Sequence, residues 1–317
     1  MIILYSPIQA WAQTDEKNAF DETIEEDNWV EPSKDEKQVE PYHEEGEVTE
    51  PITKEDKPYL ALGANLTPDQ RKTVLELLGI NPTELSDYDV IYITNEEEHA
   101  YLGEYVVSNK IGTRALSSVL IVKREKGNGI NITTKNISYC TIGMYKNALI
   151  TAGITDADII VAGPLPISGT AALVGAMKAY SDMTGDAVSE NSMDTALNEL
   201  VLTGEISESV GDSEKAEELV AYLKQEVIEK KLESEKEIKD VIDTACRQFD
   251  VTLEENETAE LTNLLQKIGD LDLDLDSIKS QAEALYEKLS NLDTQSIFDK
   301  VAGFFRSIID FFKGLFS

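Results

Sequence analysis

Apolar residues recur at regular spacing along most of the chain, but this pattern begins only near Tyr59. Residues 13–58 show no apolar periodicity and combine several prolines with many acidic side chains. A segment of this kind cannot bury enough apolar surface to offset the entropy that it loses on ordering. We therefore expect residues 13–58 to form an acidic, disordered tether.

Short β-branched runs alternate with helical patterns over residues 59–185. Thr67, Pro68 and Gln70 predict a capped helix start, and the glycines around Asn128 predict a tight hairpin. The order strand, helix, strand, strand, helix, strand is that of the ferredoxin-like motif. The sequence thus predicts a four-stranded βαββαβ sheet with helices on one face. The expected strands are residues 89–94, 117–124, 130–139 and 157–163.

Only helical patterns follow, over residues 186–292. Glu and Lys recur there at helical spacing, which favours solvent-exposed helices. We expect an acidic all-α region. The predicted fold class is therefore α+β, a ferredoxin-like four-stranded sheet domain followed by an all-α helical region.

The last segment, residues 293–317, has one strongly apolar helical face. Apolar residues fill about half of the helix circumference, and burying even three phenylalanines would contribute about 6 kcal/mol. We expect a membrane surface, another protein or a second copy of the chain to cover this face, and docking on the chain's own helices is the alternative. The face includes Phe298, Phe304, Phe305, Ile308, Phe312 and Leu315.

The net charge narrows the choice of partners. The 317 residues carry a formal charge of −33, which repels nucleic acid at long range, so we expect no nucleic-acid partner. Charges balance within residues 293–317, which makes this segment the one suited to lipid contact. With only Cys140 and Cys246, the chain has no disulfide framework.

Residues 1–12 indicate export. The segment MIILYSPIQAWA is apolar and ends in Ala10, Trp11 and Ala12, with the small residues that signal peptidase accepts. It lacks the usual positive start and is too short to span a bilayer. We interpret it as a signal-peptide remnant, with Gln13 as the mature start and an extracellular or cell-surface location.

The joint IIVAGPLPISGTAALVG is the first candidate site. A β-branched run reaches Ser168, Gly169 and Thr170, which open a helix of small residues. Nucleophile-elbow, P-loop and dinucleotide spacings are all missing. Two interpretations stay open: either Ser168 caps the helix and Gly175 allows close packing, or the helix start binds an anion or carboxylate.

Metal sites are weaker candidates, and we expect no cofactor. Glu96 and His99 have metal-ligand spacing, but helix capping by Asn95 and Glu98 explains the same residues. A calcium loop is a weak alternative, because the glycine that such a loop needs at its sixth position is Ser277. Its candidate ligands are Asp272, Asp274, Asp276 and Glu283.

Several stretches resemble the YpuA-like exported proteins of Gram-positive bacteria, a family defined as a domain of unknown function. The main ones are GINITTKNISYCTIGMYKNALITAGITDADIIVAGP and ISGTAALVGAMKAY, with TNEEEHAYLGEYV also fitting. The resemblance spans about residues 60–289 and implies export and association with the cell envelope. It implies no reaction and no active-site residue.

Two functions follow from these observations. The first is a non-catalytic binding or assembly module of the cell envelope, anchored or assembled through its C-terminal helix. The alternative is an envelope hydrolase acting on wall polymer or peptide, with His99 and Ser168 in its site. The two differ in whether His99, Ser168 and an orienting acid converge.

Overall fold

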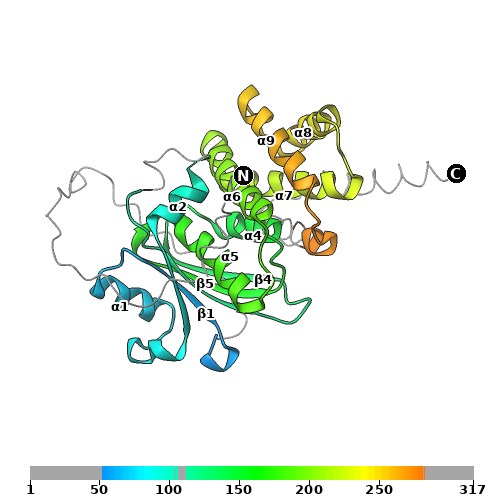
Figure 1. The fold of residues 1–317 in the computed structure, drawn as a ribbon. Helices are drawn as coiled ribbons and strands as arrows, with labels where there is room; N and C mark the ends of the chain where they lie inside the picture. Colours follow the sequence, from blue (N-terminus) through cyan, green and yellow to red (C-terminus); the bar gives the residue numbers. More distant parts are fainter. Residues whose placement is uncertain (1–51, 104, 106–111, 281, 283–317) are drawn as a thin grey trace, which may run out of the picture. The chain divides into compact units, whose positions relative to one another are not determined.

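Five strands form one mixed sheet in the computed structural model, which describes residues 52–103, 105, 112–280 and 282 (Figure 1). β1 and β2 are parallel, as are β4 and β5, and β3 runs antiparallel to both β1 and β5. The strand order is β2-β1-β3-β5-β4. The strands are β1 (Tyr59–Gly63), β2 (Asp89–Ile93), β3 (Ser118–Lys123), β4 (Ile130–Ile137) and β5 (Ala157–Ile167).

The predicted four-stranded ferredoxin-like sheet is wrong in two respects. β1 is an additional strand, and its residues after Tyr59 are all buried. A fully buried strand is a continuous apolar run, and it lacks the alternation of polar and apolar residues by which a half-exposed strand is predicted. The predicted hairpin does not form either, because β5 lies between β3 and β4. Gly127 and Gly129 do adopt positive φ, so their turn is real although the two strands it joins are not neighbours.

Helices cover both faces of this sheet. Leu60, Leu62 and Leu120 pack with α1 on one face, whereas Ala61 and Val119 belong to the cluster that contains α4 and α5. The expectation of helices on a single face is therefore wrong. The described helices are α1 (Pro68–Leu77), α2 (Asn95–Leu102), α4 (Ile142–Thr151), α5 (Thr170–Thr184), α6 (Glu190–Val210), α7 (Ser213–Lys230), α8 (Glu235–Phe249) and α9 (Glu255–Gly269).

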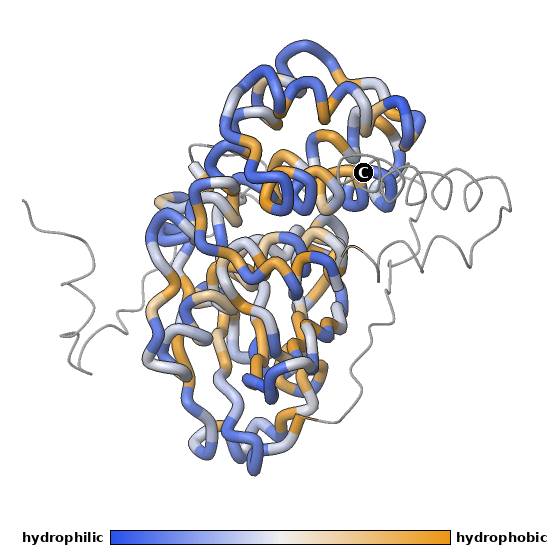
Figure 2. The backbone as a smooth tube through the Cα atoms, turned by 90° about the vertical axis from the view of Figure 1, so that its right-hand side faces the viewer, coloured by the Kyte–Doolittle hydropathy of each residue, from blue (hydrophilic) through white to orange (hydrophobic). Residues whose placement is uncertain are grey.

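The later helices do not follow the sheet as an all-α region, which also contradicts the predicted fold class. α6 packs along α4, and its Leu197 and Leu200 belong to the same apolar core as the sheet. Further along α6, Leu202 and Ile206 join α7, α8 and α9 in a second core. Figure 2 shows hydrophobic positions recurring through both the strands and these helices. None of the helices within the described ranges is long and apolar enough to cross a membrane.

A buried ion pair joins α4, α6 and α7. Lys224 Nζ donates to Glu199 Oε1 at 2.8 Å, to the Asn147 carbonyl at 2.9 Å and to Thr151 Oγ1 at 3.2 Å. The side chains of Lys224 and Glu199 are both 0% exposed. Burial lowers the pKa of Lys224 and raises that of Glu199, and their mutual attraction opposes both changes. Each side chain therefore stabilises the charged form of the other.

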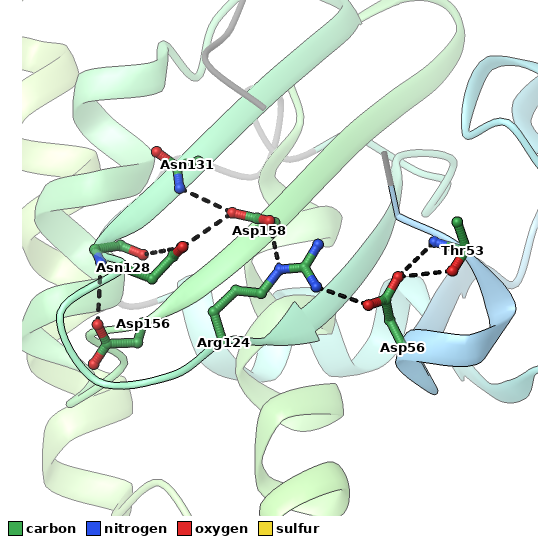
Figure 3. Close-up of polar contacts among 8 residues, drawn as sticks. Thr53, Asp56, Arg124, Asn128, Asn131, Asp156 and Asp158 are labelled. Atoms are coloured by element: carbon green, nitrogen blue, oxygen red, sulfur yellow. Dashed lines mark hydrogen bonds and ion pairs between the residues drawn. The ribbon is translucent and has the colours of Figure 1, made fainter. Parts of the chain in front are cut away.

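A second polar cluster lies where β5 begins (Figure 3). Asp158, 1% exposed, accepts hydrogen bonds from Arg124 Nε at 2.6 Å, Asn131 Nδ2 at 2.9 Å and Asn128 Nδ2 at 3.2 Å. Arg124 Nη1 also donates to Asp56 at 2.8 Å, within the short 3₁₀ helix Lys54–Asp56. This cluster holds residues 52–58 of the predicted tether against the sheet, and the rest of that segment lies outside the described residues.

Glu218 on α7 should make stability depend on pH. Burial first, and then the carboxylates of Glu214, Glu217 and Asp212, raise its pKa from 4.5 to about 8. Between pH 4.5 and about 8, the folded chain therefore holds more protons at Glu218 than the unfolded chain does. The free energy of unfolding falls as pH rises through this range, by up to about 1.4 kcal/mol per pH unit. We expect Glu218→Gln to flatten this slope in urea unfolding, whereas Glu233→Gln at an exposed position keeps it. An unchanged slope in the Glu218 variant would refute this assignment.

Candidate functional site

The candidate site is a cavity of about 260 Å³ where β5 meets α5. Gly112, Leu116, Ile167 and Ala171 contribute its less polar wall. Its polar side chains come from α2, from the segment that leads into β3, and from the predicted strand-to-helix joint. They are Glu98, Thr113, Arg114, Ser117 and Ser168.

The joint is held in place by α4 and the residues before it. The Ser168 carbonyl accepts from the Cys140 amide at 3.0 Å, and the Gly169 carbonyl accepts from the buried Tyr145 hydroxyl at 2.7 Å. Gly169 has a φ of +97°, and a Cβ there would lie 2.4 Å from the Tyr145 oxygen. Only glycine fits this position without a shift, because both the backbone angle and the space exclude a side chain.

The start of α5 is capped by a residue remote in sequence. Its N-cap is Gly169, and the Ala172 amide donates to Ser117 Oγ at 2.9 Å. The interpretation of Ser168 as the capping residue is thus wrong. The close packing predicted at Gly175 is confirmed, because a Cβ there would lie 2.8 Å from the Cβ of Ala61.

Ser168 instead belongs to a chain of hydroxyl contacts that ends at a buried acid. Its Oγ lies 3.2 Å from Thr170 Oγ1, and Thr170 donates to Oε1 of Glu98. Glu98 is 2% exposed, and its Oε2 has no hydrogen-bond partner among the described residues. A buried carboxyl oxygen without a donor is costly, so a group brought by a ligand would be stabilised there.

Sequence reasoning misassigned Glu98 by one position. The N-cap of α2 is Thr94, and Glu97 completes the capping box. Glu98 is consequently released from the cap and lies one turn before buried Leu102, on the helix face that turns inward. The spacing of Glu98 and Leu102 is the signal that could have identified it.

Burial raises the pKa of Glu98 above its ordinary value. The hydrogen bond from Thr170 and the neighbouring side chains of Asn95 and His99 oppose this effect. Protonated Glu98 can donate to a ligand acceptor, and ionised Glu98 can accept from a ligand donor. The arrangement therefore supports recognition of polar groups.

The described contacts do not join the two residues that the hydrolase alternative requires. His99 Nε2 lies 2.9 Å from the Gly112 carbonyl, whereas Ser168 contacts Thr170. His99 is not among the residues that line the cavity. Ser168, Thr170 and Glu98 come together, and the imidazole points to a different partner.

The structure does not assemble the metal candidates. Within the described ranges, no group of three or more His, Cys, Asp or Glu side chains is placed to hold a metal ion. In the calcium alternative, Asp274 accepts from Ser277 Oγ at 2.5 Å, as in a helix cap. Glu283 and the apolar face of residues 298–315 lie outside the described residues.

Comparison with known proteins gives a family without an assigned activity. A family model described as a protein of unknown function, DUF1002, matches residues 62–285. The uncharacterized protein YpuA of Bacillus subtilis (strain 168) is 34% identical over 259 residues, which cover 81% of this chain and 87% of that protein. No solved structure matches the chain. The matched region contains every residue of the cavity.

Proposed function

Because the chain belongs to the DUF1002 family of proteins of unknown function, we propose from its own geometry that it is a binding module for a small polar ligand. The observation that carries this proposal is Glu98, buried, lining the cavity and lacking a partner at Oε2. Cavities lined by apolar residues and a few polar side chains are typical of small-molecule binding. The contact of Ser168 with Thr170 supports binding over nucleophilic catalysis.

A fragment screen on the full chain tests this function. Ligand-observed NMR with a library of small polar fragments should identify binders, and Glu98→Gln should weaken them at least tenfold. The reason is that a hydrogen bond to a charged group contributes about 1.5–3 kcal/mol. Glu96→Gln, on an exposed position of the same helix turn, is the matched control and should leave affinity unchanged. The proposal fails if no fragment binds or if both variants bind equally well.

The proposal also retains export and a cell-envelope location, with Gln13 as the mature start. The apolar segment that ends in Ala12 supports it, as does the apolar face of residues 293–317. In this account the C-terminal segment holds the binding module at a membrane surface or joins it to another protein or a second copy.

Removal of residues 296–317 tests the role of the C-terminal segment. The shortened chain should lose binding to liposomes or sediment as a smaller oligomer. The reason is that burial of the apolar face against another surface is the driving force for either contact. A substitution of Phe304 and Phe305 by serine in the full chain should give the same loss. If the full chain, the shortened chain and the serine variant bind liposomes equally and have the same size, the apolar face packs within its own chain.

A further inference from the structure

The polar groups of the Glu98 cavity are arranged to accept hydrogen bonds. Thr170 donates its one hydroxyl proton to Glu98 Oε1, so it can only accept in its contact with Ser168. Ser168 is therefore the donor in that contact, and its oxygen keeps the capacity to accept from a further group. Glu98 and Ser168 both line the cavity, so two acceptors border the same space. A ligand bound there needs hydrogen-bond donors.

Glu98 also favours a positive charge on that donor. It is 2% exposed, and its Oε2 has no hydrogen-bond partner within the part of the chain that the structure describes. A buried carboxyl oxygen gains most from a charged donor, because charge-assisted hydrogen bonds are about twice as strong as neutral ones. An ammonium group supplies the charge and three donors, enough for Glu98 and a neighbouring hydroxyl oxygen together.

The rest of the cavity wall suits a hydrocarbon body. Leu116, Ile167 and Ala171 line it beside the polar groups. Arg114 lines it too, but it already has a partner within the chain and makes no hydrogen bond to Glu98 Oε2. One cationic end and an apolar remainder therefore match this wall without an anionic group on the ligand.

We propose that the ligand is a small primary amine, bound as its ammonium by Glu98 Oε2 and Ser168 Oγ, with its hydrocarbon part against the apolar wall. This inference rests on the proposed function and names the class of ligand. The size of the cavity agrees with it, since about 260 Å³ lies just below the roughly 300–1,000 Å³ typical of sites for larger ligands. Such amines are charged at neutral pH, because an alkylammonium group like that of lysine has a pKa of about 10.4.

Binding of the ammonium should release a proton from Glu98. Burial raises the pKa of Glu98 in the ligand-free chain, and a cation at its oxygens would lower that pKa again. Affinity should thus increase as pH rises through the pKa of Glu98 in the free chain. The other titratable or charged groups near Glu98 or on the same wall are His99, Arg114, Cys140 and Tyr145. Burial raises the pKa values of Cys140 and Tyr145, so these two stay neutral up to neutral pH.

Calorimetry on the full chain tests the ligand class. The probes are the straight-chain primary amines from ethylamine to hexylamine, each with two analogues of the same chain length. The trimethylammonium analogue keeps the charge but has no donor, and the alcohol keeps a donor but has no charge. We expect at least one amine to bind about tenfold or more tightly than either analogue, because both the charge and the donors contribute. Titration in buffers of different ionisation enthalpy should show the proton release.

Three variants locate the bound ammonium. Glu98→Gln should weaken the best amine about tenfold or more and abolish the proton release. Ser168→Ala should weaken the amine severalfold and leave the trimethylammonium analogue unchanged, because only the amine donates to a hydroxyl oxygen. This variant keeps Glu98, so it tests the inference even if the Glu98 variant does not fold. Glu96→Gln, at an exposed position of the same helix, should bind as the natural chain does.

The outcomes separate this inference from the function on which it rests. If the alcohols or trimethylammonium analogues bind as tightly as the amines and depend on Glu98, the amine is wrong and the binding module remains. The same holds if no amine binds while other polar fragments bind and depend on Glu98. Amines that bind equally to the Glu98 and Glu96 variants would also overturn the inference. Loss of Glu98 dependence for every fragment as well would overturn both.

Discussion

Replacing Lys224 by methionine is expected to lower the free energy of unfolding by about 3–5 kcal/mol, the largest effect that we predict for a single side chain. The variant leaves the Glu199 carboxylate fully buried without its cation, and it removes the donor to the Asn147 carbonyl and to Thr151. Urea unfolding at neutral pH measures the change. The effect involves three helices, because these side chains join α4, α6 and α7.

Two matched variants show whether the pairing is the cause. Lys236→Met breaks an ion pair with Asp240 on the surface of α8, where the side chains are 84% and 61% exposed, and should change stability by less than about 1 kcal/mol. Combining Lys224→Met with Glu199→Leu should recover much of the loss, because well-packed apolar residues often replace a buried ion pair at little cost. A similar loss at Lys236, or no recovery in the double variant, would contradict this account.

Gly169→Ala is expected to lower the free energy of unfolding by about 2–5 kcal/mol. The left-handed backbone costs about 1–2 kcal/mol for a residue with a side chain, and displacing the Tyr145 hydroxyl adds the cost of overpacking. The shift would also disturb the joint that presents Ser168 and Thr170 to the cavity. Thermal unfolding together with fragment binding measures both effects.

Gly185 provides the control for the backbone effect. It ends α5 with a φ of +72°, and a Cβ there would meet nothing within 4 Å. Gly185→Ala should therefore show only the backbone cost of about 1–2 kcal/mol and unchanged fragment binding. Equal losses in the two variants would mean that the contact with Tyr145 does not matter.

The sequence predicted the local elements better than their arrangement. The capping box of Thr67 and Gln70 is confirmed, because capping depends on residues three positions apart. The order of strands depends on pairing between distant segments, and the turn at Gly127 and Gly129 reveals nothing about β5 entering between β3 and β4. Turn residues predict a change of direction, but they do not predict which strands become neighbours.

Of the candidate site, the sequence pointed only to the strand-to-helix joint and not to the charged side chains. Ser168 of the joint lines the cavity, and Thr170 contacts Ser168. An anion bound at this helix start stays a prediction. Glu98 was missed because the capping box was placed one position too late, although its spacing to buried Leu102 marks an inward-facing position. Arg114 was missed because nothing local distinguishes it from the other bases of the chain. They come together only when α2 and the segment before β3 pack beside α5, which is a consequence of the tertiary structure.

The carboxyl ¹³C resonance of Glu98 gives the most direct test of the cavity as a binding site. It can be assigned by its loss in Glu98→Gln and followed by NMR while the tightest probe from the screen is added to the full chain. We predict a shift that saturates with the dissociation constant of that probe, while the resonance of Glu96 stays constant. A Glu98 resonance that does not move at saturating probe would contradict the central claim.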